Sequence, residues 1–238
     1  MSSTASSLTF ARVTIALAGA VLALAGCVSR FTHGTLLHQD DFESGLASWH
    51  IEAEKPGRIT AHNGVLDIDV PAGVTLWFKP RLEGPVLIEF EATAVAEGGP
   101  NDQVSDLNVF WMANNADGKH PVFASERSGA FGGYNNLLTY YVGLGGNRNT
   151  TTRFRRYIGD PEVRPLLPGH DLSARSAMLV SNRAQTITLI ADGPHIEYRR
   201  DGARLFQLED AAPYVNGWFG LRTTYSHLRI RRFRAYRP

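Results

Sequence analysis

Hydrophobic and polar residues alternate with a period of two over many short stretches of this chain. Between Pro85 and Ala94, for example, Val86, Ile88 and Phe90 share one face of the stretch and the residues between them share the other. Such alternation is typical of β-strands that bury one face more than the other. No stretch shows a sustained helical period, and no internal repeat emerges. The pattern therefore predicts an all-β domain.

Turn residues separate the predicted strands. Pro71-Ala72-Gly73 predicts one turn, Asp201-Gly202 predicts a hairpin, and Pro161–Asn182 predicts a long loop with at most a turn of helix. Many short strands of this kind predict a single-domain sandwich or jelly roll, in which the first and last strands often pair. The predicted strands are Gly64–Val70, Val74–Lys79, Pro85–Ala94, Asp106–Met112, Leu138–Leu144, Thr151–Tyr157, Thr186–Ala191, His195–Arg200, Leu205–Leu208, Trp218–Thr223 and Leu228–Tyr236.

The period of two also assigns side chains to faces. In Asp106–Met112, the residues Leu107, Val109 and Trp111 are predicted to face the core, and Phe110 to face away from it. The same reasoning on the other strands predicts one groove that gathers polar side chains. Its predicted members are Asp106, Asn108, Tyr141, Arg153, Arg155, Tyr157 and Arg222, with His227 in a loop at a strand end.

The stretch Tyr140–Tyr157 carries the most polar part of this groove. Its two predicted strands flank the turn Gly145–Asn149, in which Asn147 and Arg148 offer further hydrogen-bonding groups. Two guanidinium groups and a phenol on one strand face suit a polar, anionic ligand, because arginine binds carboxylates with two hydrogen bonds.

Composition narrows the class of ligand. The net charge of +1 hides an asymmetry: residues 28–147 hold 7 Lys+Arg against 15 Asp+Glu, and residues 148–238 hold 16 arginines against 8 acidic residues. These arginines are spread over alternating strands without a lysine-rich tail or a nucleic-acid-binding motif, which argues against nucleic acid. The eight histidines are scattered without zinc-binding spacing.

The sole cysteine, Cys27, lies in the setting of a bacterial lipoprotein leader. Arg12 gives a short basic region, Val13–Leu22 is apolar but short for a membrane span, and Leu24-Ala25-Gly26 precedes the cysteine. This pattern predicts a signal peptide over residues 1–26, a lipidated tether over 27–39 and one domain over 40–238. The residue after Cys27 is Val28 and not an aspartate. By resemblance to Gram-negative sorting rules, the lack of an aspartate at this position favours an anchor in the outer membrane of the cell envelope.

Several segments resemble known families. DDFESGLASWH near the start, the hairpin IEYRRDG and the ending GWFGLRTTYSHLRIRRFRAYRP resemble concanavalin A-like jelly rolls, the fold of legume-lectin-like domains, glucanases, alginate and heparin lyases and keto-glycoside hydrolases. EGGPNDQVSDLNVFWMA and YYVGLGGNRNTTTRFRRY resemble a bacterial domain family related to YesU-type proteins of rhamnogalacturonan utilisation loci. The resemblance implies a protein that binds or cleaves polysaccharide in the groove, and we expect a monomer. Proteins of this fold commonly hold structural calcium, for which Asp40, Asp41 and a carbonyl of a late strand could be ligands.

The groove residues suit β-elimination at a uronic acid, our first interpretation. That reaction needs the sugar carboxylate neutralised, which Arg153, Arg155 or Asn108 could do. Tyr141, Tyr157 or His227 could remove the proton, with Asp106 a further acid–base candidate. The remaining polar residues, Asn147, Arg148 and Arg222, are expected to bind substrate.

Two alternatives stay open. Hydrolysis of a glycosidic bond needs two carboxylates, for which Asp102 with Asp106 and Glu89 with Glu91 are candidates. The glucanase pattern Glu-x-Asp-x-x-Glu and the short motifs of the lyases are both absent. A glycan-binding lipoprotein without catalysis is the other alternative. It is favoured by exposed planar aromatic residues, for which Trp77 and Phe110 are candidates.

Overall fold

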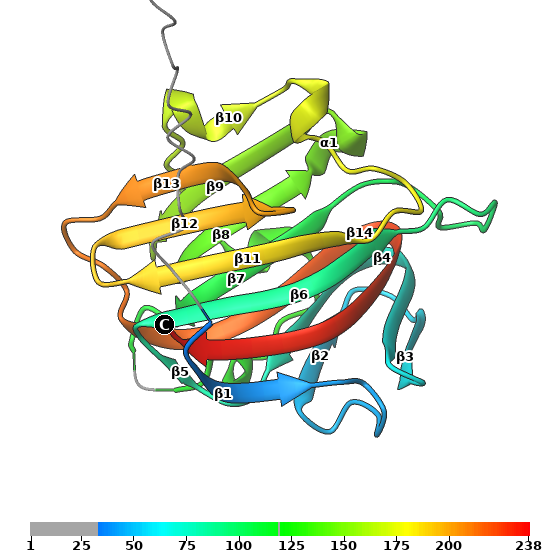
Figure 1. The fold of residues 1–238 in the computed structure, drawn as a ribbon, viewed down its shortest axis with the longest axis horizontal. Helices are drawn as coiled ribbons and strands as arrows, with labels where there is room; N and C mark the ends of the chain where they lie inside the picture. Colours follow the sequence, from blue (N-terminus) through cyan, green and yellow to red (C-terminus); the bar gives the residue numbers. More distant parts are fainter. Residues whose placement is uncertain (1–32, 119) are drawn as a thin grey trace, which may run out of the picture. The chain divides into compact units, whose positions relative to one another are not determined.

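The computed structural model describes residues 33–118 and 120–238, which fold into antiparallel strands (Figure 1). The predicted leader and Cys27 lie outside these residues. Within them, no helix is long and apolar enough to cross a membrane. Four short 3₁₀ helices cover Val122–Ala124, Phe131–Tyr134, Pro168–His170 and Arg175–Ala177. The strands are β1 (Thr35–Asp40), β2 (Trp49–Ala53), β3 (Arg58–His62), β4 (Val65–Phe78), β5 (Leu82–Glu83), β6 (Val86–Ala94), β7 (Leu107–Asn114), β8 (Leu138–Gly145), β9 (Thr151–Ile158), β10 (Asp171–Leu172), β11 (Gln185–Asp192), β12 (His195–Arg200), β13 (Ala203–Glu209) and β14 (Asn216–Arg237).

The strands form one antiparallel sheet that folds over on itself, with β14 at its centre. The order is β10-β9-β8-β7-β14-β6-β11-β12-β13, and β4 runs along β14. The first part of β14 pairs with β7, and its last part pairs with β6. We call the half formed by β7 to β10 and the first part of β14 the pocket sheet. Figure 1 shows β14 and β4 curving together from one half of the sheet to the other.

The curve in β4 and β14 explains two errors of the sequence-based prediction. Pro71-Ala72-Gly73, predicted as a turn, lies inside β4, and β14 was predicted as two strands. Val70 pairs with Ser226 and Gly73 pairs with Thr224, so the register shifts at this point. A bulge bends a strand without ending it, and it accommodates a proline that cannot donate a ladder hydrogen bond.

The core lies between the two halves of the sheet and confirms the predicted faces. Leu107, Val109 and Trp111 of β7 are buried there with Phe154 of β9. Phe154 lies 5.8 Å, ring to ring, from Phe206 of β13, on the opposite half. The alternation of hydrophobic residues was therefore sufficient to orient these strands.

A second apolar cluster covers part of the pocket sheet's other face. It consists of Trp77, Phe110, Ala113, Val122, Tyr134, Leu137, Tyr141, Tyr157 and Trp218. Residues 120–137, which we call the cap segment, contribute Val122, Tyr134 and Leu137. The expectation that Trp77 and Phe110 are exposed is wrong, because the cap segment buries both side chains completely. Trp77 donates its indole hydrogen to Glu52 (3.0 Å), so it is not a sugar-stacking surface.

The two ends of the domain meet, as predicted. β1 pairs antiparallel with the end of β14. It begins at Thr35, ahead of the expected domain start at Asp40, so part of the expected tether is strand. Asp40 accepts hydrogen bonds from the indole of Trp49 and the amide of Phe42, both 2.8 Å, and Asp41 pairs with Arg234.

Asp40 and Asp41, the two carboxylates named above as possible calcium ligands, thus have partners within the fold. Residues 33–118 and 120–238 also contain no cluster of three or more histidine, cysteine, aspartate or glutamate side chains that could hold a metal ion. Structural calcium at Asp40, Asp41 and a carbonyl of a late strand therefore stays a prediction.

Candidate functional site

A polar pocket of about 280 Å³ opens on the pocket sheet beside the cap segment. We call it the arginine pocket. Of the residues predicted to form a groove, it brings together Asp106, Tyr141, Asn147, Arg153 and Arg155. The complete lining is Asp106, Phe131, Tyr141, Gly143, Gly146, Asn147, Thr151, Arg153, Arg155 and Arg164.

The three arginines of the pocket differ in their partners. Arg153 is bound by Asp171 of β10 through two hydrogen bonds, of 2.9 and 3.2 Å. Arg155 donates to the backbone oxygen of Arg164, and Arg164 donates to the hydroxyl of Tyr157 at 3.2 Å. Among residues 33–118 and 120–238, neither Arg155 nor Arg164 forms an ion pair. Burial, and then the charge of Arg164, lowers the pKa of Arg155.

Asp106 is the pocket's acidic group. It lies directly before β7 with a φ of 57°, a left-handed conformation that aspartate tolerates better than most residues. The hydroxyl of Ser105 donates to it at 2.5 Å, and the amide of Asn108 approaches it at 3.4 Å. Burial raises the pKa of Asp106 above its ordinary value, although these two contacts oppose the change. A carboxyl group with a raised pKa is suited to proton transfer.

Tyr141 brings a hydroxyl to the same pocket. Its ring packs against Phe110, Phe131 and Tyr157, at 5.1–5.6 Å between ring centroids. A Cβ added at Gly143 would lie 2.7 Å from the Tyr141 oxygen, so glycine leaves the space that this hydroxyl occupies. The hydroxyl has no hydrogen-bond partner within the described residues. Burial strongly raises the pKa of Tyr141, which therefore keeps its proton at neutral pH.

Tyr157 and Asn108 lie behind the pocket's surface. Tyr157 is fully buried, and it contacts the pocket through the hydrogen bond from Arg164. Asn108 is also buried, and its side-chain oxygen has no partner among the described residues. Both support pocket residues and do not line the pocket.

The turn between β8 and β9 forms one wall of the pocket. Asn147, Arg148 and Asn149 have φ values of 54°, 57° and 61°, three successive left-handed residues that cost backbone energy. Asn149 holds the turn in place by bonding both the amide (2.8 Å) and the carbonyl (3.0 Å) of Leu179. The side chains of Asn147 and Arg148 are left exposed at the surface.

Arg222 lies beneath the cap segment and outside the pocket lining. It is 2% exposed and donates to the Thr75 hydroxyl at 3.0 Å and to the Gly129 carbonyl at 2.7 Å. Its guanidinium lies 5.1 Å from the ring of Phe131 and 4.9 Å from that of Tyr134. Arg222 thus fixes the cap segment to β14 and β4, and its charge reaches the pocket only at a distance.

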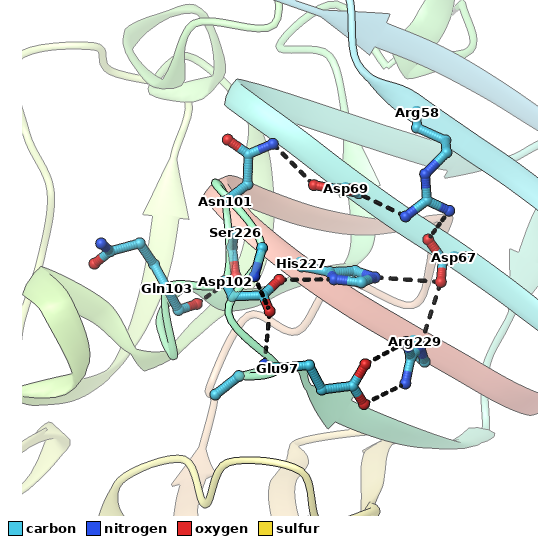
Figure 2. A network of polar contacts seen from close by, with 12 residues as sticks. Arg58, Asp67, Asp69, Glu97, Asn101, Asp102, Gln103, Ser226, His227 and Arg229 are labelled. Carbon is cyan, nitrogen blue, oxygen red and sulfur yellow. Dashed lines mark hydrogen bonds and ion pairs between the residues drawn. The ribbon is translucent and has the colours of Figure 1, made fainter.

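His227 belongs to a separate network (Figure 2). Its Nδ1 lies 2.9 Å from Asp102 and its Nε2 lies 3.2 Å from Asp67. Arg229 links Asp67 to Glu97, and the network continues to Arg58, Asp69 and Asn101. The sequence-based prediction put His227 in a loop at a strand end, but it lies within β14. The structure does not bring His227 to the arginine pocket.

The other acidic candidates also lie elsewhere. Asp102 is held in the His227 network, Glu89 contacts Thr188, and Glu91 pairs with Arg232. Among the described residues, Asp106 is therefore the single carboxylate that lines the arginine pocket. Hydrolysis by two carboxylates has no matched pair there.

Sequence reasoning missed Arg164 and Phe131. Arg164 lies in the stretch Pro161–Asn182, which was correctly predicted to be irregular apart from two short 3₁₀ helices and the two-residue β10. Phe131 lies in the cap segment. Loops lack the period of two that orients strand residues, so the sequence carried no signal that placed either side chain at the pocket.

Comparisons with known proteins give the following likenesses. A family model described as "Domain of unknown function (DUF6250)" matches residues 68–233. A search of curated proteins finds no match to the sequence.

Among solved structures, the chain is similar to a protein of unknown function with a galectin-like fold from Bacillus subtilis, with a TM-score of 0.68, 13% identity, and coverage of 87% of this chain and 97% of that one. It is similar to the carbohydrate-binding module CBM66 from Bacillus subtilis, with a TM-score of 0.54, 9% identity, and coverage of 80% and 96%. It is also similar to LamA from Zobellia galactanivorans in complex with laminaritriose and laminaritetraose, with a TM-score of 0.57, 12% identity, and coverage of 87% and 100%. These likenesses show the jelly-roll fold that the sequence predicted.

Proposed function

The chain belongs to the DUF6250 domain family, and from the chemistry of its pocket we propose that it binds an acidic saccharide there. The observation that carries the proposal is the pair Arg155 and Arg164. Both line the pocket, and neither has a carboxylate partner among the described residues. A sugar carboxylate would supply the missing anion through charge-assisted hydrogen bonds.

The character of the pocket supports a sugar more than an apolar ligand. Its lining combines carboxyl, amide, guanidinium and hydroxyl groups with two aromatic rings, those of Phe131 and Tyr141. Such groups match the hydroxyls of a saccharide. The structural neighbours include a carbohydrate-binding module and LamA in complex with laminaritriose and laminaritetraose, which favours a carbohydrate ligand on this fold.

Calorimetric titration with saccharide pairs tests the proposal. We expect the purified protein to bind a uronic-acid oligosaccharide and to bind its carboxyl-reduced counterpart much more weakly. A charge-assisted hydrogen bond contributes about 1.5–3 kcal/mol, so Arg155→Gln or Arg164→Gln should weaken binding roughly 10- to 100-fold.

Two control variants make the test specific. Arg153→Gln should have a smaller effect, because Asp171 already neutralises Arg153. Arg183→Gln, which removes an exposed arginine paired with Asp201 on another surface, should have none. Equal binding of the acidic and the carboxyl-reduced saccharide would contradict the proposal.

A second candidate function is β-elimination at the bound uronate, favoured by the unpartnered hydroxyl of Tyr141 beside Asp106. Arg155 and Arg164 would neutralise the uronate carboxylate, and Asp106 would take the proton from C5. Tyr141, which keeps its own proton, would donate it to the glycosidic oxygen as the C4–O bond breaks and the C4–C5 double bond forms.

Ultraviolet absorbance of the unsaturated product distinguishes elimination from binding. Elimination predicts that absorbance rises with the wild-type protein and stays flat with Tyr141→Phe and with Asp106→Asn. Saccharide affinity should persist in both variants. Binding without any unsaturated product would reject elimination and leave the binding proposal intact.

We also propose that Cys27 is lipidated and that the protein is anchored to an outer membrane. The support is the basic and apolar run before Leu24-Ala25-Gly26-Cys27. Cys27→Ser should move the protein from the membrane fraction to the soluble fraction. Persistence in the membrane fraction would contradict the anchor.

A further inference from the structure

A second pocket adjoins the arginine pocket across the β8–β9 turn. It has a volume of about 340 Å³, and it shares two lining residues, Asp106 and Asn147, with the arginine pocket. Arg148 of the turn and Tyr225 of β14 also line this second pocket. Because the two pockets have residues in common, a ligand longer than one sugar can occupy both.

Tyr225 has the properties of a sugar-stacking surface. The residue is 47% exposed, in contrast to Trp77 and Phe110, which are completely buried. It lies at the bulge where β4 and β14 bend, with a φ of 46°. A bulky residue is rare in that backbone conformation, and bulges commonly redirect a side chain. The bulge therefore presents an aromatic ring at the pocket's rim, where the apolar face of a sugar ring can pack on it.

Arg148 provides an available charge in the lining of the second pocket. It is exposed and makes no hydrogen bond or ion pair with any residue in 33–118 and 120–238. Gln103 also lines the pocket. Figure 2 shows its side-chain amide pointing away from the His227 network, while its backbone oxygen accepts a bond from Ser226 (2.9 Å). A cation and an amide beside an aromatic ring suit a second acidic sugar.

We propose that the two pockets are adjoining subsites for neighbouring acidic units of one saccharide chain. The proposal rests on the saccharide-binding function proposed above. The first unit places its carboxylate between Arg155 and Arg164. The chain crosses Asp106 and Asn147, and the second unit packs on Tyr225 with its carboxylate at Arg148. The ligand is therefore a polyuronate segment of at least two units, and the protein binds along a chain.

Titration of the purified protein with galacturonic acid, its dimer and its trimer tests the second subsite, and the mannuronic acid series is measured in parallel. We expect the dimer to bind at least about tenfold more tightly than the monomer, because it adds a charge-assisted contact and a stacked ring. The trimer should gain little more.

Two variants remove side chains of the second subsite and keep the left-handed backbone conformation at their positions. Tyr225→Asn and Arg148→Asn place asparagine at left-handed positions that it tolerates. Both should abolish the advantage of the dimer and leave monomer affinity unchanged, whereas Tyr225→Phe should keep that advantage. Arg155→Gln should weaken the binding of monomer and dimer alike.

The outcomes separate the two proposals. If the monomer binds and Arg155→Gln weakens it, but the dimer binds no more tightly, the second subsite is refuted and the saccharide function stands. The second subsite is also refuted if the dimer's advantage survives in both asparagine variants. If no member of either series binds, the proposed function fails and the subsite fails with it.

Discussion

The network around His227 allows a stability prediction to be worked out in full, through Asp102. One oxygen of Asp102 accepts hydrogen bonds from the amides of Glu97 (2.6 Å) and Gly99 (2.9 Å), and the other faces His227 at 2.9 Å. Burial alone would raise the pKa of Asp102. The two amides and His227 outweigh burial and lower the pKa from 3.8 to about 2. Asp102→Asn keeps the shape of the side chain and removes its charge.

The size and sign of the effect follow from that pKa. A change from 3.8 to about 2 corresponds to about 2 kcal/mol of folding free energy. Because the folded-state pKa is the lower one, this contribution is complete above about pH 4 and is lost as the pH falls through about 2. The side chain is only 6% exposed, so screening by solvent removes little of it.

Urea unfolding of the wild type and Asp102→Asn, measured from pH 7 down to the lowest pH at which both still fold, provides the assay. We expect Asp102→Asn to lose about 2 kcal/mol at pH 7, and the loss to shrink as the pH falls below about 4. Glu43→Gln, which changes an exposed carboxylate, is the matched control and should stay within about 0.5 kcal/mol of the wild type. A loss of the same size at every pH would refute the electrostatic reasoning. Unchanged saccharide affinity in Asp102→Asn would agree with the separation of this network from the arginine pocket.

Three further predictions concern other contacts. Tyr140→Phe removes the hydroxyl that accepts a hydrogen bond from the amide of Tyr214 and donates one to Asp210, which then keeps Arg156 as its one side-chain partner among the described residues. Urea unfolding should show that the free energy of unfolding falls by about 1–2 kcal/mol. Gly129→Ala places a Cβ 2.4 Å from the amide nitrogen of Glu54 at a φ of 83°, so the cap segment should detach. Protease cleavage within residues 120–137 should then rise, and saccharide affinity should fall. Gly132→Ala is the control, because a Cβ there meets nothing within 4 Å, and it should change neither cleavage nor affinity. Because burial raises the pKa of Asp106, saccharide affinity should increase as the pH falls from neutral towards that pKa. Calorimetry should show that Asp106→Asn removes this pH dependence of affinity. If the pH dependence persists in Asp106→Asn, Asp106 is excluded as its source.

The strands and their faces could be predicted because each rests on a local pattern. Leu107, Val109 and Trp111 face the core, and Arg153 and Arg155 face the pocket, as a period of two requires. The pairing of the first and last strands was also predicted from the fold class.

The remaining features depend on contacts between residues distant in sequence. His227 was predicted in the groove, but its position is set by Asp67 and Asp102, which lie far away along the chain. The burial of Trp77 depends on the cap segment, whose path has no periodic signal. Tyr225 becomes an exposed ring because β14 bulges at that residue, and a bulge is not visible in alternation alone.

The central strand β14 has a consequence for how the chain acquires its fold during synthesis. Its residues, the last 22 before Pro238, pair with β1, β4, β5, β6 and β7. Until they leave the ribosome, β6 and β7 each have an unpaired edge, and the two halves of the sheet lack the strand that joins them. Folding is therefore expected to wait until β14 has been synthesised and to proceed slowly, because these pairings close long loops. Deleting β14 should thus prevent folding of the whole domain, and the nascent chain should depend on factors that keep strand edges from aggregating.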